Sequence, residues 1–82
     1  MQGNPNPNVL TLFVVYDCPM CAHARAWLKE MKIEYVERDN ANDFGALRAM
    51  YKLTKQNLVP VFEVRGHALV RPTDEEMANF LL

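Results

Sequence analysis

The sequence predicts an α/β fold in which a four-stranded mixed sheet carries helices on both faces. Residues 9–16 form a nearly unbroken apolar run, rich in β-branched and aromatic side chains, which is typical of a strand buried on both faces. A helical pattern and a second strand follow, which favours a parallel β-α-β unit with a right-handed crossover. Residues 61–64 and 67–70 flank an Arg-Gly pair and indicate an antiparallel hairpin. The predicted element order is β-α-β-α-β-β-α.

The first helix is expected to begin at Pro19, because proline is tolerated in the first helical turn. Apolar side chains then recur at helical spacing and define one inward face. They are Cys21, Ala24, Trp27 or Leu28, and Met31. Residues 33–37 alternate between apolar and polar side chains, as a second strand does. Residues 38–42 are predicted to form a polar loop.

The second helix is predicted to start after Asn42 or Asp43, either of which can cap it, and to end near Thr54. Its inward residues are expected to be Phe44, Leu47 and Met50 or Tyr51. Gly66 supplies a positive φ for the hairpin turn, whose type the sequence leaves open. The run Thr-Asp-Glu-Glu at residues 73–76 fits a capping box that starts a last helix. The inward residues of that helix are expected to be Met77, Phe80 and Leu81.

The composition bounds the class of protein. The chain has 82 residues, half of them hydrophobic, and a net charge of −1, which fits one small folded domain. The sequence has no basic stripe of the kind that would predict binding to nucleic acid or to a membrane surface. It also has no apolar run long enough to span a bilayer. Residues 1–8 lack the pattern of a secretory signal, and their prolines and asparagines predict a flexible tail before a domain at residues 9–82. We therefore expect a cytoplasmic protein.

The two cysteines form the motif Cys-Pro-Met-Cys at residues 18–21. A Cys-x-x-Cys pair at the start of a helix that follows a strand is typical of thiol–disulfide exchange sites. Cys18 is the predicted nucleophile, because free N–H groups and the helix dipole favour a thiolate at that position. The charge of Asp17 is expected to offset this effect in part. Cys21 lies one turn into the helix and is the predicted resolving thiol, which attacks the mixed disulfide formed by Cys18.

Two other interpretations of the cysteine pair are weaker. A zinc half-site would need further ligands such as His23 and His67, and the sequence has no second cysteine pair at zinc spacing. We therefore expect no metal. Two inert core cysteines are disfavoured because the proline between them marks the start of a helix. Neither histidine has a visible aspartate partner in the sequence, so no proton-transfer role is assigned to either.

The chain resembles the glutaredoxin branch of the thioredoxin fold over residues 9–82. In this element order, four features carry the resemblance: the motif at residues 18–21, the run Ala-Arg-Ala-Trp-Leu at residues 24–28, the dipeptide Val59-Pro60 and the closing helix. It implies that Pro60 follows a cis peptide bond and faces the cysteine pair. It also implies that the backbone of Val59 pairs with an extended substrate, as in strand addition. Met20 occupies the variable position of the motif, where a flexible thioether suits varied protein partners, although an exposed filler is an equal alternative.

The last helix departs from the glutaredoxin pattern. Glutaredoxins hold the glutamyl carboxylate of glutathione near its N-terminus, where this chain has Thr73 and Asp74. Asp74 would repel an anion, so helix capping is the favoured role of this pair. The family's Gly-Gly is absent, and so is the basic residue that often precedes the first cysteine. Arg71-Pro72 instead resembles the NrdH-redoxins, which are reduced by thioredoxin reductase. Surface solvation is the default expectation for Arg71 itself.

The resemblance implies a dithiol oxidoreductase that reduces protein disulfides or glutathione mixed disulfides through Cys18 and Cys21. We expect a monomer without a tightly bound cofactor, with glutathione as co-substrate or thioredoxin reductase as electron source. An NrdH-redoxin-like electron donor to ribonucleotide reductase is the first alternative. An iron–sulfur or metal carrier, in which two copies hold a cluster through Cys18 and external thiols, is the second. A thioredoxin-fold binding module with incidental cysteines is the third.

Overall fold

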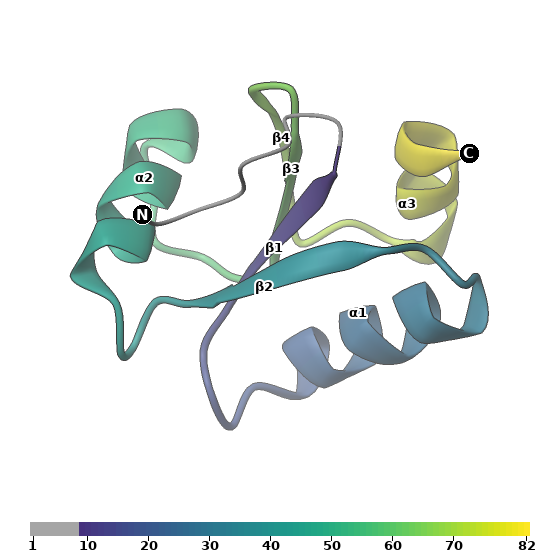
Figure 1. Cartoon of the computed structure of the whole chain (residues 1–82), viewed down its shortest axis with the longest axis horizontal. Coiled ribbons are helices and arrows are strands. Elements are labelled where there is room, and N and C mark those ends of the chain that lie inside the picture. The colour runs from purple at the N-terminus through teal and green to yellow at the C-terminus, as the bar shows by residue number, and fades with distance from the viewer. Residues whose placement is uncertain (1–8) are drawn as a thin grey trace.

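Four strands and three helices make up residues 9–82, the part of the chain that the computed structural model describes (Figure 1). The tail predicted for residues 1–8 lies outside the described residues. The order β-α-β-α-β-β-α is confirmed. The elements are β1 (Leu10–Val14), α1 (Pro19–Glu30), β2 (Tyr35–Asp39), α2 (Phe44–Thr54), β3 (Val61–Val64), β4 (His67–Val70) and α3 (Asp74–Leu81).

The strands form one mixed sheet in the order β2-β1-β3-β4. Strands β1 and β2 are parallel, whereas β3 runs antiparallel to both β1 and β4. Every residue of β1 is buried, as expected for a central strand covered on both faces. Helix α2 lies on one face of the sheet, and α1 and α3 lie on the other (Figure 1). None of the helices among residues 9–82 is long and apolar enough to cross a membrane.

Two strand boundaries differ from the sequence prediction. Strand β1 ends at Val14, because the chain turns away from the sheet before Asp17, whose φ is 64°. Strand β2 begins two residues later than predicted and includes Arg38 and Asp39, which were expected in a loop. Parallel pairing with β1 explains this shift, because Phe13 and Val14 are the register partners of these two residues. Tertiary pairing therefore sets the end of β2 where local polarity predicted a loop.

Helix α2 is rotated relative to the predicted inward face. Its cap is Asp43, whose Oδ1 accepts a hydrogen bond from the backbone N–H of Ala46 at 3.1 Å, and it ends at Thr54 as predicted. Ala46 and Met50 are buried against the sheet, but the Phe44 side chain is 79% exposed and Tyr51 is also exposed. The expectation for Phe44 was wrong because the stripe that contains Met50 reaches Ala46 at a spacing of four residues.

The hairpin and the last helix follow the sequence closely. Arg65 and Gly66 both have positive φ, 53° and 83°, which is the type I′ geometry that the sequence left open. The capping box at the start of α3 is complete, with Thr73 as the cap. Met77 is fully buried and the other two predicted inward residues of α3 are partly buried. Helix α3 thereby closes the core on the side of α1.

Candidate dithiol active site

Cys18 caps helix α1 with its own sulfur. Its backbone is extended (φ −123°, ψ 111°), and its Sγ accepts a hydrogen bond from the backbone N–H of Cys21 at 3.3 Å. Its carbonyl accepts the next helical hydrogen bond, from Ala22 at 3.0 Å. Pro19 is the first helical residue, where no N–H is needed. The sulfur therefore takes the place that a serine or aspartate oxygen usually takes at a helix start.

The two thiols differ in their access to solvent. Both cysteines are free thiols, with Cys18 partly exposed and Cys21 0% exposed. Cys18 lines a shallow surface hollow together with Asp17 and Arg25. Cys21 lies on the buried face of α1, in the hydrophobic core. An external disulfide can therefore reach the sulfur of Cys18 but not that of Cys21. The predicted assignment of one attacking and one resolving thiol fits this difference.

The surroundings of Cys18 favour its thiolate. Partial burial opposes ionisation, but hydrogen bonds from Cys21 and from the backbone of Met20 outweigh it, together with the positive charge of Arg71. The pKa of Cys18 therefore lies below its ordinary value of 9.0. Because the thiolate is the nucleophile in disulfide exchange, this shift increases the reactive fraction at neutral pH.

The surroundings of Cys21 favour its protonated form. Burial raises the pKa of Cys21 to about 11, and the hydrogen bond and charge of Cys18 act in the same direction. The two sulfurs are thus separated in acidity as well as in exposure. The Cys18 thiol ionises first, and the Cys21 thiol stays protonated while Cys18 is charged.

Val59 and Pro60 lie buried beside the cysteine motif. The peptide bond between them is cis, as predicted. Pro60 and Met20 line the same small apolar pocket of about 90 Å³, next to His23 and Met77. The Met20 side chain is 44% exposed and forms part of the outer surface there. The structure therefore brings Met20 and Pro60 to one pocket beside the cysteine motif.

Arg71 makes contacts at the site that sequence reasoning did not predict. It is exposed, as expected, but its Nε also donates to the carbonyl of Val59 at 2.7 Å and its backbone N–H donates to the carbonyl of Pro60 at 2.9 Å. Its φ of 47° lies in the left-handed region, which is uncommon for arginine. Arg71 therefore ties the end of β4 to the loop before β3 and brings a positive charge near Cys18. The sequence offered one weak signal, its position directly before Pro72.

The N-terminus of α3 is occupied by its own side chains. Thr73 Oγ1 accepts from the backbone N–H of Glu76 at 3.1 Å, and Glu76 Oε1 accepts from the backbone N–H of Thr73 at 2.8 Å. Asp74 Oδ1 lies 2.7 Å from Nε2 of His23 on α1. The expectation that His23 lacks an aspartate partner was wrong, because the partner is 51 positions away in the sequence. This contact is exposed and contributes little to stability.

The zinc alternative gains no support from the geometry. His23 is engaged with Asp74, and His67 is exposed at the start of β4. Among residues 9–82, no three histidine, cysteine or acidic side chains lie where they could hold one metal ion.

The fold and the paired cysteines define the class, a thioredoxin-fold protein with a thiol redox function. Residues 10–69 match the glutaredoxin family model, so the chain belongs to the glutaredoxin family. The matched segment contains both cysteines, Val59 and Pro60. It ends before Arg71 and before α3, the region where the sequence departs from the glutaredoxin pattern.

Individual relatives agree with this assignment. A glutaredoxin-like 8.6 kDa protein from the rubredoxin operon of Clostridium pasteurianum is 29% identical over 62 residues, which cover 76% of this chain and 83% of that protein. The global transcriptional regulator Spx 2 of Bacillus cereus is 27% identical over 61 residues, covering 71% of this chain but only 47% of the regulator. This chain thus spans about half the length of Spx 2.

Solved structures show the same fold. The thioredoxin-like protein BC3987 superposes with a TM-score of 0.77 at 22% identity, covering 89% of this chain and 99% of that chain. A point mutant of the same protein superposes with a TM-score of 0.82 at 21% identity, covering 88% of this chain and 92% of that one. At this identity the comparison establishes the thioredoxin-like fold.

Proposed function

We propose that this protein is a dithiol oxidoreductase that reduces protein disulfides or glutathione mixed disulfides through Cys18 and Cys21. The observation that carries the proposal is the asymmetry of the pair. Cys18 is a partly exposed sulfur at a helix start with a lowered pKa, and Cys21 is a buried thiol with a raised pKa. This is the arrangement that a two-step exchange requires.

In the first step, the Cys18 thiolate attacks one sulfur of the substrate disulfide. A mixed disulfide forms and one substrate thiolate leaves. Burial keeps the pKa of Cys21 high, but the charge and hydrogen bond of the Cys18 thiolate, which also raise it, disappear when Cys18 enters the mixed disulfide. Cys21 then loses its proton more easily and attacks the Cys18 sulfur. The second substrate thiolate leaves, so the substrate gains two electrons and the chain holds a disulfide.

The surface beside the dithiol supports substrate binding through Val59, Pro60 and Met20. Met20 and Pro60 line one apolar pocket, which suits an apolar side chain flanking the substrate sulfur. The carbonyl of Val59 already accepts from Arg71, so its N–H is the group that remains for an extended substrate. We propose that the protein works in the cytoplasm as a monomer without a tightly bound cofactor.

Two reductants are candidates for regenerating the dithiol, and the start of α3 favours one of them. Glutathione, the first candidate, would place a carboxylate near Thr73 and Asp74 by the family resemblance. In this chain the capping box already satisfies two of the N–H groups there, and three acidic residues occupy the first turn of α3. These features favour the second candidate reductant, thioredoxin reductase. With that reductant the protein would be an NrdH-redoxin-like electron donor to ribonucleotide reductase.

Two coupled assays on one preparation test the proposal. One assay supplies glutathione with glutathione reductase, and the other supplies thioredoxin reductase, each with NADPH and a protein disulfide. We expect activity in at least one assay, loss of it in Cys18→Ser, and no change in Lys29→Gln, an exposed substitution on the same helix. Turnover only with thioredoxin reductase would select the NrdH-like function. Undiminished turnover in Cys18→Ser would refute the proposal.

Two further outcomes would replace it with a different function. A brown dimer from oxygen-free purification would indicate a carrier of an iron–sulfur cluster held through Cys18. A partner protein that binds equally well to wild type and to Cys18→Ser, without any turnover, would indicate a binding module. The partial likeness to a transcriptional regulator makes this second control worthwhile.

A further inference from the structure

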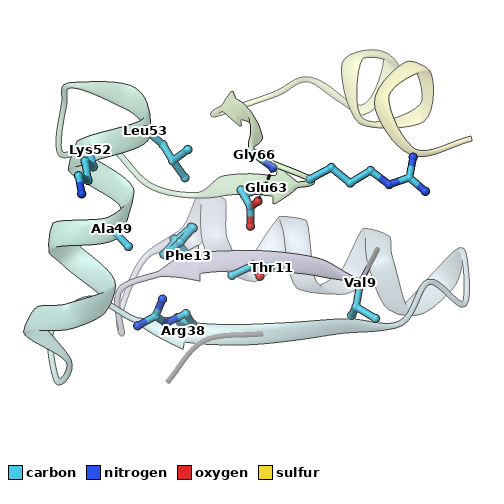
Figure 2. Close-up of a pocket in the computed structure, with 10 residues that line it drawn as sticks. Val9, Thr11, Phe13, Arg38, Ala49, Lys52, Leu53, Glu63 and Gly66 are labelled. Carbon is cyan, nitrogen blue, oxygen red and sulfur yellow. Dashed lines mark hydrogen bonds between the residues drawn. The ribbon is translucent and has the colours of Figure 1, made fainter. Parts of the chain in front are cut away.

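A second cavity lies on the sheet face that α2 covers, and no residue of the dithiol site lines it. Its volume is about 640 Å³, the largest of the hollows described for residues 9–82. Figure 2 shows that its floor is the sheet and that its side wall is α2, which contributes Ala49 and Leu53. Volumes of this size hold small organic molecules in other proteins.

The cavity exists because α2 covers only part of its sheet face. Phe13 lies next to α2, whereas Thr11 lies farther along β1, beyond the helix, and Val9 directly precedes that strand (Figure 2). Glu63 on β3 pairs with Thr11 across the sheet and lies on the same face. The side chains of one strand alternate between faces, so Thr11 and Phe13 belong to this face and Leu12 to the opposite one.

Thr11 is a polar residue in the floor of the cavity (Figure 2). The residue is 3% exposed and lines the cavity. Its hydroxyl can both donate and accept a hydrogen bond, so it offers a partner to a polar atom of a ligand bound there.

The charged residues around the cavity are mostly positive. Arg38, Lys52 and Arg65 line it, against a single carboxylate, Glu63. The Oε2 atom of Glu63 already accepts from the backbone N–H of Gly66 at 2.8 Å, drawn as a dashed line in Figure 2. Arg38 is itself paired with Asp43, and Arg65 has an interaction of its own, so the excess of positive charge is small and Lys52 contributes most of it. A small positive excess still favours an anionic ligand.

Arg38 is the most distinctive of these cations. Its side chain is 14% exposed, and its guanidinium carbon lies 5.8 Å from the centre of the Phe13 ring. Its ion pair with Asp43 is long, at 3.5 Å, and the structure gives its other donors no partner within residues 9–82. A largely buried guanidinium with unused donors, beside an aromatic ring, is well suited to bind a carboxylate or sulfonate.

We propose that this cavity binds a small organic anion with a flat apolar body. The anionic group lies toward Arg38 and Lys52 and away from Glu63. The apolar body lies against Phe13 and Leu53, and a polar atom of the ligand pairs with the Thr11 hydroxyl. The ligand site is separate from the dithiol and does not depend on the proposed redox function.

The probe for the test is 8-anilinonaphthalene-1-sulfonate, an anion with a flat aromatic body that fluoresces when it leaves water. Titration of the full chain is expected to give saturable binding with one probe per chain. In ¹H–¹⁵N correlation spectra, the amides that move are expected to belong to β1, α2 and the hairpin turn. Amides at residues 18–21 are expected to stay in place.

Four single substitutions then test the site, and each has an expected effect on the affinity for the probe. Thr11→Val preserves the shape of the side chain and is expected to weaken binding about fivefold, the effect of one hydrogen bond, without lowering thermal stability. Lys52→Gln is expected to weaken binding about threefold, and Glu63→Gln to strengthen it about twofold, because each changes one exposed charge. Lys29→Gln removes a lysine on α1, far from the cavity, and is expected to change nothing.

Four results would overturn the proposal. One is the absence of saturable binding up to millimolar probe. Another is a set of moving amides centred on the dithiol, which would place the probe on the Met20 surface instead. A third is equal weakening by Lys52→Gln and Lys29→Gln, which would show attraction to overall charge only. The fourth is concentration-dependent dimerisation that competes with the probe, because the cavity would then be an interface between copies.

Discussion

Helices α1 and α3 begin close together, yet their N-termini are built in opposite ways. At α1 the cap is the sulfur of Cys18, and the first turn contains no acidic residue. At α3 the cap is Thr73 within a complete capping box, and the first turn contains three acidic residues. Both ends have free N–H groups and a partial positive charge. At α1 one of these N–H groups donates to the sulfur of Cys18, whereas at α3 the capping box satisfies two of them with the side chains of Thr73 and Glu76.

The difference indicates which helix end performs chemistry. A complete capping box stabilises a helix and satisfies two of its free donors, so fewer remain for a ligand. A sulfur is a weaker hydrogen-bond acceptor than a serine oxygen, so α1 begins less stably and gains a reactive group. Substitutions at the two ends are therefore expected to have opposite effects, and four predictions test this contrast from the largest effect to the smallest.

The largest expected effect is on thiol reactivity. In Cys21→Ser, where Cys18 is the one remaining thiol, alkylation by iodoacetamide at pH 7 is expected to be at least about tenfold faster than in Cys18→Ser, because the pKa of Cys18 lies below its ordinary value, whereas burial alone still raises the pKa of Cys21 and shields its sulfur. As pH rises, the Cys18 rate is expected to reach its plateau first. The measurement is the rate against pH for both variants. Equal rates would contradict the contrast between the two sulfurs.

The next effect concerns stability, with opposite signs at the two helix ends. Thr73→Ala is expected to lower the free energy of unfolding by about 1 kcal/mol, because it removes a cap. Cys18→Ser is expected to leave stability unchanged or to raise it, because a hydroxyl is the better cap. Urea unfolding of the reduced proteins measures both, with Thr73→Ser as the control that keeps the cap. A loss of stability in Cys18→Ser would mean that the sulfur contributes more than a cap.

A smaller effect is expected on the use of glutathione. Asp74→Asn removes one negative charge from the start of α3, so the apparent KM for glutathione is expected to fall about threefold in the glutathione-coupled assay. The control is Glu30→Gln, at the far end of α1. An unchanged KM in Asp74→Asn would show that this helix end does not face the co-substrate.

The smallest expected effect concerns Arg71. Partial burial raises the pKa of Cys18, whereas hydrogen bonds and the charge of Arg71 lower it. Arg71→Gln removes the charge, so the pKa is expected to rise and the alkylation rate at pH 7 to fall by about twofold. Arg71→Lys keeps the charge and is expected to restore most of the rate. If both variants lose the rate equally, the contact with Val59 matters rather than the charge.

Most of the fold could be predicted because its signals are local. Caps, helical spacing and turn residues act within a few positions, and so the starts of α1 and α3 and the hairpin at Gly66 were found correctly. The inward face of α2 was found only in part: Leu47 and Met50 pack inward, but Phe44 does not, because the helix contains more apolar residues than the sheet covers. Phe44 remains outside for that reason.

The cysteines could be assigned from the sequence, but their electrostatic environment could not. The cap position of Cys18 follows from a strand, a proline and a helical pattern in succession. The contact of Arg71 with Val59 spans 12 positions, and that of His23 with Asp74 spans 51. Such contacts depend on how the sheet and helices pack, and no local pattern encodes them. The cavity beside α2 is also a product of packing, because it forms where one helix fails to cover four strands.

The burial of Cys21 also constrains the kinetics. Once the two sulfurs are joined, only the one at position 18 can be reached from outside, so a reductant has to attack the same atom that earlier attacked the client. Electron donor and electron acceptor cannot both occupy that atom. Double-reciprocal plots at several fixed levels of the second substrate are therefore expected to be parallel, as in a double-displacement mechanism.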